Sequence, residues 1–287
     1  MFHRSRQSQP KRYSFGNRSN YHQNQNHRQR TLDPSSIISQ SLVENGYQNQ
    51  KLAIEKEFIP SHSFSDFPIV DQLKRNITKV GYTKPTPIQD QIIPHILAGK
   101  DVVGIANTGT GKTAAFLIPL INHAFLDRFQ KVLIITPTRE LAVQIRDDLN
   151  GFAVGMNIDS VLCIGGVGIG PQIQRLRRNP QFVIGTPGRL RDLEGTRNIN
   201  FGSFNNIVLD EVDRMLDIGF VVEIKHIVSC LAPKRHSLFF SATVPGSVQD
   251  IIRSFLTNPI TVSVKSTDSV DAIHQDVVKT NGKPKIE

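Results

Sequence analysis

The chain has 287 residues, of which 38% are hydrophobic, and this is enough to bury a substantial core. Its formal net charge is +9 at pH 7. No apolar run of the sequence reaches the roughly 18 residues that a membrane span needs, and the N-terminus lacks the apolar centre of a secretory signal. These properties exclude a membrane-spanning class of protein, so we expect a soluble, cytoplasmic protein without a membrane partner.

Residues 1–60 form a basic extension that is rich in Gln and Asn and poor in aliphatic side chains. Such a segment cannot bury enough apolar surface to offset chain entropy, so we expect disorder. Its charge favours nonspecific contact with nucleic acid, while a solubilising extension and a transit peptide remain alternatives. Residues 1–31 contain seven basic residues and no acidic one: Arg4, Arg6, Lys11, Arg12, Arg18, Arg28 and Arg30.

From about residue 68 onward, short runs rich in Val and Ile alternate with helical patterns, and we assign residues 61–265 to one domain. Most of these runs are apolar on both faces, which is typical of parallel strands covered on each side. We therefore predict an α/β fold with a doubly wound, mainly parallel sheet and helices on both faces. Residues 266–287 turn polar and resemble the start of a linker. The predicted strands are 101–106, 131–136, 159–164, 182–186, 206–210, 237–241 and 260–264.

The two cysteines, Cys163 and Cys230, lie in the apolar runs VLCIGG and HIVSCLA. We identify neither a second thiol nor a His at ligand spacing beside them. The pattern therefore predicts buried core thiols in both runs, and neither a disulfide nor a zinc site.

The segment ANTGTGKT follows a predicted strand and opens a predicted helix, which is the context of a phosphate-binding loop. Gly109 and Gly111 permit backbone torsions that turn N–H groups inward, and the helix dipole adds positive potential. Lys112 would reach the β- and γ-phosphates of ATP, and the Thr113 hydroxyl would hold Mg²⁺. Ala106 replaces the Gly that usually opens the pattern. The candidate nucleotide-binding residues here are Ala106, Asn107, Thr108, Gly109, Thr110, Gly111, Lys112 and Thr113.

The segment NIVLDEVD places carboxylates at the end of another apolar strand. Asp210 is the second candidate ligand for Mg²⁺, through water, because Mg²⁺ keeps much of its hydration shell. Glu211 is the candidate for positioning and deprotonating the attacking water. Together with Lys112, these two carboxylates predict the catalytic half of an ATPase.

Further motifs occur in one fixed order: GYTKPTPIQ (81–89), PTRELA (137–142), the doublet Gly165–Gly166, TPGR (186–189) and SAT (241–243). In this order, with DEVD in the acidic position, the chain resembles the N-terminal RecA-like domain of DEAD-box RNA helicases from Phe64 to about Val264. The resemblance implies a Q motif in which Gln89 contacts adenine with its amide, while Phe64 and Tyr82 offer rings for stacking the base.

The resemblance also implies a groove that binds the sugar-phosphate backbone of RNA, largely without regard to sequence. Asp213 would couple the nucleotide state to this groove through hydrogen bonds with Ser241 and Thr243. The implied RNA-binding residues are Pro137, Thr138, Arg139, Gly166, Thr186, Gly188 and Arg189.

The implied activity is ATP-dependent separation of short RNA duplexes by two RecA-like domains in one monomer. The chain contains no H-R-x-G-R-x-x-R segment, which in the family supplies arginine fingers from the second domain. We therefore expect weak nucleotide binding and very little hydrolysis by these residues alone. Two alternatives stay open: a non-hydrolysing RNA- or protein-binding module on the same fold, and an ATPase switch that acts on DNA or protein.

Overall fold

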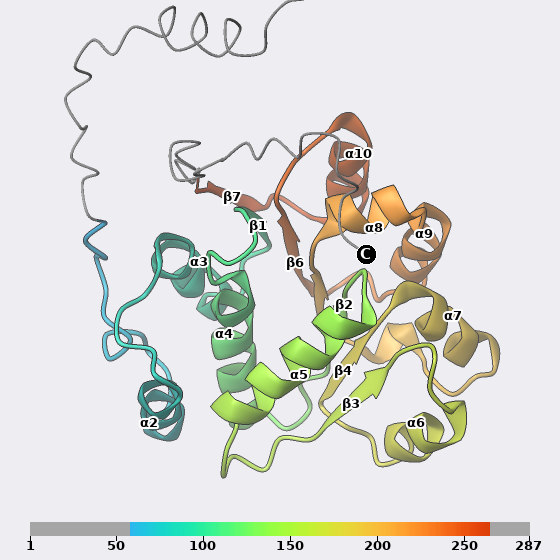
Figure 1. The fold of residues 1–287 in the computed structure, drawn as a ribbon, viewed down its shortest axis with the longest axis horizontal. Helices are drawn as coiled ribbons and strands as arrows, with labels where there is room; N and C mark the ends of the chain where they lie inside the picture. Colours follow the sequence, from blue (N-terminus) through green and yellow to red (C-terminus); the bar gives the residue numbers. More distant parts are fainter. Residues whose placement is uncertain (1–57, 265–287) are drawn as a thin grey trace, which may run out of the picture. The chain divides into compact units, whose positions relative to one another are not determined.

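The computed structural model describes residues 58–264, so most of the predicted basic extension and the predicted linker lie outside the described residues. The described residues form a single seven-stranded sheet with helices on both of its faces (Figure 1). No helix within residues 58–264 is long and apolar enough to span a membrane.

All neighbouring strands of the sheet pair in parallel, in the order β3-β4-β2-β5-β6-β1-β7. Each of the seven strands predicted from the sequence is present, with ends that differ by no more than a residue or so. The doubly wound α/β prediction is therefore confirmed. The strands are β1 (Val102–Ile105), β2 (Val132–Ile135), β3 (Ser160–Cys163), β4 (Phe182–Gly185), β5 (Asn206–Leu209), β6 (His236–Ser241) and β7 (Ile260–Ser263).

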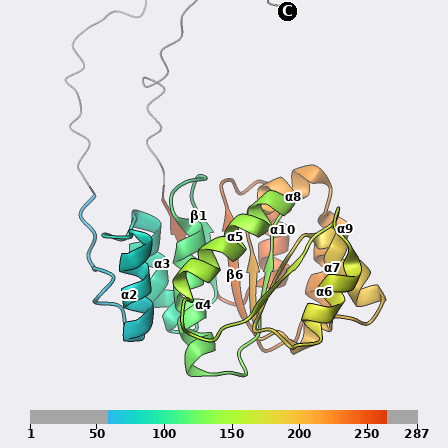
Figure 2. The same cartoon turned by 60° about the horizontal axis from the view of Figure 1, so that its bottom comes forward.

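Two hydrophobic cores separate the helices into two layers (Figures 1 and 2). The first layer packs on one face and contains α2 (Asp71–Val80), α3 (Pro87–Leu97), α4 (Lys112–Leu126) and α5 (Arg139–Phe152). The second layer packs on the other face and contains α6 (Ile169–Leu176), α7 (Pro187–Gly195), α8 (Val212–Ile218), α9 (Val221–Ser229) and α10 (Gly246–Phe255). A short 3-10 helix, η1 (Phe201–Ser203), leads into β5.

Strand β2 shows why both faces of the sheet must be covered. Val132 and Ile134 belong to the first core, whereas Leu133 and Ile135 belong to the second. Successive side chains of a strand point to opposite faces, so a run that is apolar at every position needs a helix layer on each side.

The motif segments lie where strands end. Because the strands are parallel, the loops after β1 to β6 emerge at the same edge of the sheet. The phosphate-loop segment follows β1, and the segments that contain Arg139, Gly166, Arg189, Asp210 and Thr243 follow the next five strands. The fold therefore collects the sequence motifs at one edge, although they span more than a hundred residues of the chain.

Candidate functional site

The loop between β1 and α4 has the backbone that an anion site requires. Gly109 and Gly111 have φ values of 84° and 94°, which L side chains rarely adopt. Helix α4 begins at Lys112 and has no side-chain cap, so its first amides remain free to bind an anion. Lys112 is buried, and its Nζ donates a hydrogen bond of 2.5 Å to the Ala106 carbonyl oxygen. The Lys112 ammonium group is thus bonded within the loop, and a phosphate would compete with the Ala106 carbonyl oxygen for it.

Gln89 joins the start of α3 to this loop. Its Oε1 accepts a hydrogen bond from the Thr86 backbone N–H at 3.0 Å, and its Nε2 donates to the Gly111 carbonyl oxygen at 3.1 Å. The side chain is 0% exposed, and a Cβ at Gly111 would collide with it. Both amide atoms are therefore engaged, and a contact with adenine requires that these bonds be exchanged.

The two aromatic candidates for base stacking differ in exposure. Phe64 is 6% exposed and belongs to the first core, where its ring makes edge contacts with Phe67 and Tyr82 at centroid distances of 6.0 Å. Tyr82 is half-buried and also packs edge-on against Phe152 at 5.3 Å. Tyr82 therefore offers more free ring surface to a ligand than Phe64 does.

The carboxylate of Asp210 is buried close to the phosphate loop. Burial raises its pKa to about 7, and the positive charge of Lys112 opposes this shift, whereas the negative charges of Glu211 and Asp213 add to it. A divalent cation beside this carboxylate would relieve the unfavourable burial of its charge. The hard oxygen donors of Asp210 and Thr113 fit Mg²⁺, which prefers such ligands.

Glu211 occupies a strained position between β5 and α8. Its φ and ψ of 50° and 52° lie in the left-handed region, where a non-glycine residue costs about 1 to 2 kcal/mol. Its Oε2 lies 3.2 Å from Nη1 of Arg214, whose side chain is largely exposed. This ion pair uses one of the two carboxylate oxygens of Glu211.

Asp213 makes the hydrogen bonds that the resemblance implied. Its Oδ2 accepts from the backbone N–H and the hydroxyl of Thr243 at 2.8 and 2.9 Å, and its own N–H donates to the Ser241 hydroxyl at 3.3 Å. Burial raises the pKa of Asp213, but these hydrogen bonds outweigh it and hold the pKa below its usual value. The Ser241 carbonyl oxygen also accepts from Ala106 N–H at 3.1 Å. Ser241 thus connects the phosphate loop with the acidic segment.

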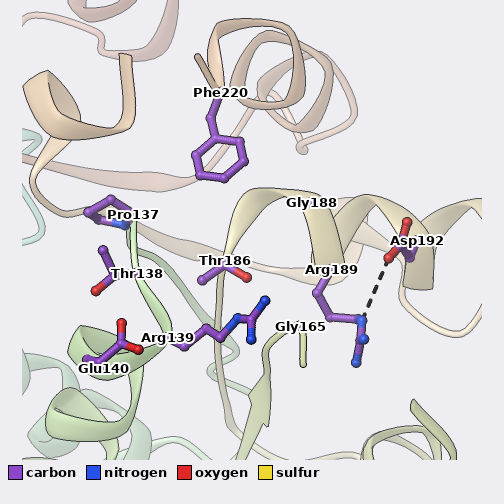
Figure 3. A pocket seen from close by; sticks show the side chains of 10 residues that line it. All are labelled: Pro137, Thr138, Arg139, Glu140, Gly165, Thr186, Gly188, Arg189, Asp192 and Phe220. Carbon is purple, nitrogen blue, oxygen red and sulfur yellow. Dashed lines mark ion pairs between the residues drawn. The ribbon is translucent and has the colours of Figure 1, made fainter. Parts of the chain in front are cut away.

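A cavity of about 450 Å³ opens at the same edge, between the starts of α5 and α7 (Figure 3). Its lining includes six of the seven residues predicted to bind RNA, and Gly165 stands there in place of Gly166. The N-termini of both helices face it, and α7 has no side-chain cap. Free helix amides and guanidinium groups suit a phosphate backbone. The lining residues are Pro137, Thr138, Arg139, Glu140, Gly165, Thr186, Gly188, Arg189, Asp192 and Phe220.

Each arginine of this cavity is positioned by a different neighbour. Arg139 extends toward Gly165 (Figure 3). A Cβ at the neighbouring Gly166 would collide with its guanidinium group. Arg189 donates to the Val167 carbonyl oxygen at 3.3 and 3.4 Å and lies 3.7 Å from the Asp192 carboxylate. Gly166 has a φ of 78°, so both its torsion and this contact require glycine.

Sequence reasoning missed three of the cavity residues: Glu140, Asp192 and Phe220. Asp192 follows Arg189 by three residues, which is the spacing of neighbours on a helix face, so its ion pair had a signal in the sequence. Phe220 follows Gly219, which ends α8 with a φ of 100°, and no local pattern connects it with the cavity residues that follow β2 and β4.

The prediction for the cysteines is confirmed for Cys163, which is buried, and is wrong for Cys230, which is half-buried. Cys230 also has a His at ligand spacing after all. His226 stands four residues earlier, and its Nε2 lies 3.8 Å from the Cys230 sulfur because α9 brings both to one face.

Comparisons with known proteins agree with this geometry. Residues 86–251 match the family model described as DEAD/DEAH box helicase. The chain is 40% identical over 241 residues to DEAD-box ATP-dependent RNA helicase 20 of Arabidopsis thaliana, covering 81% of this chain and 48% of that one. It is 38% identical over 227 residues to DEAD-box ATP-dependent RNA helicase CshA of Bacillus subtilis, covering 78% and 46%. The chain thus spans about half the length of these relatives.

Solved structures share the fold. A crystal structure of a DEAD box protein from the hyperthermophile Methanococcus jannaschii matches with a TM-score of 0.68 and 33% identity, over 71% of this chain and 56% of that one. A hypothetical ATP-dependent RNA helicase from Sulfolobus tokodaii matches with a TM-score of 0.63 and 34% identity, over 67% and 56%. Since the family model covers residues 86–251 of the 287, the chain belongs to the DEAD/DEAH box helicase family.

Proposed function

We propose that this chain is the ATP-binding half of an ATP-dependent RNA helicase, which binds the RNA backbone and requires a second RecA-like domain for turnover. One observation carries the proposal: the phosphate loop and the acidic segment lie at one sheet edge and are joined through Ser241. The cavity proposed to bind the RNA backbone opens at that same edge.

In the proposed mechanism, the free amides at the start of α4 bind the phosphates of ATP, and Lys112 exchanges the Ala106 carbonyl for the β- and γ-phosphates. Thr113 and Asp210 would hold Mg²⁺, which supplies charge neutralisation when bound. Glu211, which is paired with Arg214 in this structure, would orient the attacking solvent molecule and accept its proton.

Recognition of the base and of RNA uses separate parts of the edge. Gln89 would exchange its bonds to Thr86 and Gly111 for adenine, with Tyr82 and Phe64 beside the ring. Arg139, Arg189 and the helix amides would bind successive phosphates of one RNA strand, without reading bases. Asp213 would transmit the nucleotide state through Thr243 and Ser241.

The proposal extends to a monomer and to RNA as the polymer, and it predicts weak nucleotide binding with very little hydrolysis by these residues alone. The lengths of the relatives support a second domain, since this chain covers 48% and 46% of the two described above. Cytoplasmic location stays a prediction from composition.

The test measures binding of a non-hydrolysable ATP analogue with Mg²⁺ by calorimetry, and binding of single-stranded RNA and DNA of equal length at two salt concentrations. We expect nucleotide binding, and tighter binding of RNA with a steep salt dependence. Robust RNA-stimulated turnover by these residues alone would refute the need for a second domain. Equal affinities and equal salt slopes for the two polymers would refute RNA as the preferred ligand.

A further inference from the structure

Three side chains of different chemistry meet on the second helix layer, and none of them lines the cavity described above. Glu194 lies in the last turn of α7, His226 lies in α9, and Cys230 directly follows α9. The His226 Nε2 is 3.2 Å from the Glu194 Oε2 and 3.8 Å from the Cys230 sulfur. All three donor atoms lie within 4.8 Å of one another.

These separations resemble the edges of a tetrahedral coordination sphere. Zinc bonds of about 2.0 to 2.3 Å to oxygen, nitrogen and sulfur place neighbouring ligand atoms roughly 3.3 to 3.7 Å apart. The two distances at His226 are 3.2 and 3.8 Å, so small side-chain rotations would bring both partners to bonding positions. The third separation, between Glu194 and Cys230, is no more than 4.8 Å.

We propose that Glu194, His226 and Cys230 form a zinc-binding site that joins the ends of α7 and α9. A thiolate and an imidazole favour a borderline-soft cation such as Zn²⁺ over Mg²⁺, which binds oxygen ligands. The three side chains supply three ligands, and water completes the sphere. The Cys230 thiol gives its proton to solvent as the sulfur binds, so zinc affinity rises with pH.

The backbone around the cluster is rigid enough to hold such a geometry. Leu193 and Ile227, which neighbour Glu194 and His226, are fully buried in the second core. The Cys230 N–H donates to the His226 carbonyl oxygen at 3.2 Å, so the helical turn continues to the cysteine. The side chains of Glu194 and His226 are 34% and 36% exposed, which leaves access for an ion and for water.

The site would also affect the proposed RNA groove, because α7 and α9 each extend from that groove to the zinc cluster. Arg189 in the first turn of α7 and Phe220 at the start of α9 line the cavity, whereas the opposite ends of both helices carry the cluster. Between them, Arg191 and Glu223 lie 4.0 Å apart. Zinc would tie the two helices at their C-terminal ends. Zinc binding itself does not depend on the proposed helicase function.

The experiment uses Co²⁺ as a spectroscopic probe on the purified 287-residue chain. We expect a sulfur-to-cobalt charge-transfer band with one ion bound per chain, displaced by Zn²⁺. The sequence has two cysteines, and the other, Cys163, is buried in the core. Cys230→Ser should abolish the band, and His226→Asn and Glu194→Gln should each weaken Zn²⁺ affinity by at least 10- to 100-fold, the size typical of losing even an outer-shell partner.

Glu223→Gln is the matched control, since it removes the other polar contact between α7 and α9 and should leave the band intact. Thermal unfolding in the presence of a chelator checks that each variant is folded. If one of the three ligand variants does not fold, the His226 or the Glu194 variant that does fold is a sufficient test of the site. A band that survives Cys230→Ser, a wild-type chain without a band, or equal loss in Glu223→Gln would overturn the proposal.

Discussion

The phosphate-loop region and the cavity between α5 and α7 share one sheet edge but differ in how completely their polar groups are already bonded. In the loop region the candidate ligand groups are bonded within the protein: Lys112 donates to the Ala106 carbonyl oxygen, Gln89 donates to the Gly111 carbonyl oxygen, and Glu211 accepts from Arg214. In the cavity, the first amides of α7 have no side-chain cap, although Arg189 already donates to the Val167 carbonyl oxygen and lies 3.7 Å from Asp192.

This difference separates two modes of recognition. A nucleotide must displace existing hydrogen bonds, so its affinity is the difference between new and broken contacts. The uncapped amides at the start of α7 already face the cavity, so binding of a nucleic-acid backbone there needs less rearrangement. When each ligand is measured without the other, variants of the loop region should therefore affect nucleotide binding, and variants of the cavity should affect polymer binding. The proposed contacts of Asp213 couple the two sites only when both ligands are bound.

The largest effect is expected from Glu211→Gln, measured in a longer chain that carries a second RecA-like domain. Removing the proposed base should lower RNA-stimulated phosphate release by about 10²- to 10⁴-fold. Nucleotide affinity should change little, because the lost ion pair with the largely exposed Arg214 is worth at most about 1 kcal/mol.

Arg214→Gln is the control for this variant, since it breaks the same ion pair and keeps the carboxylate. Its rate of phosphate release should stay near that of the unmodified protein. Full turnover in Glu211→Gln would remove Glu211 from the proposed role.

Lys112→Ala tests the loop region directly. The loss of a buried, charged donor should weaken binding of an ATP analogue by about 2 to 4 kcal/mol, or roughly 30- to 1000-fold, measured by calorimetry. Lys100→Ala makes the same change at the amino end of β1, on the opposite edge, and should have no effect. RNA affinity should be unchanged in both variants, and a parallel loss of RNA binding in Lys112→Ala would break the division between the two regions.

Arg189→Ala tests the cavity. Loss of one phosphate contact should weaken RNA binding about 10-fold or more across sequences, and should reduce the slope of log K against log salt by about one. Binding of the ATP analogue should not change. Arg197→Ala removes an equal charge from an exposed residue just beyond the far end of α7 and should leave both slope and affinity as they are. Equal slopes for the two variants would show that Arg189 contacts no phosphate.

The sequence could predict the sheet and the order of its motifs because these depend on local patterns. Runs such as Val132–Ile135 are apolar at every position, and parallel strands bring their carboxyl ends together. It could not predict which groups bind each other before a ligand arrives. The hydrogen bond between Gln89 and Gly111 joins residues 22 apart through tertiary packing. The sequence motif alone is equally consistent with Gln89 as an adenine contact.

Contacts between distant elements explain the other differences. His226 and Cys230 have a helical spacing that can be read from the sequence once α9 is recognised, but Glu194 lies 32 residues before His226 on a different helix. Phe220 enters the cavity only because α9 starts beside α7. Likewise, the sequence predicts a turn at Gly166, but only the folded structure shows that the guanidinium group of Arg139 packs against this glycine.

Gly166→Ala should give the smallest effect, and it tests that last contact. The φ of 78° costs an alanine about 1 to 2 kcal/mol of folding free energy, measured by denaturant unfolding. The new Cβ must also displace Arg139, so RNA affinity should fall several-fold while nucleotide affinity is kept. Gly168→Ala is the matched control, because its φ is −54° and a Cβ there meets its nearest atom, on Pro171, at an ordinary 3.7 Å. If both alanine variants bind RNA equally well, the position of Arg139 over the doublet does not contribute to the groove, and the cavity is less pre-organised than the comparison with the phosphate loop requires.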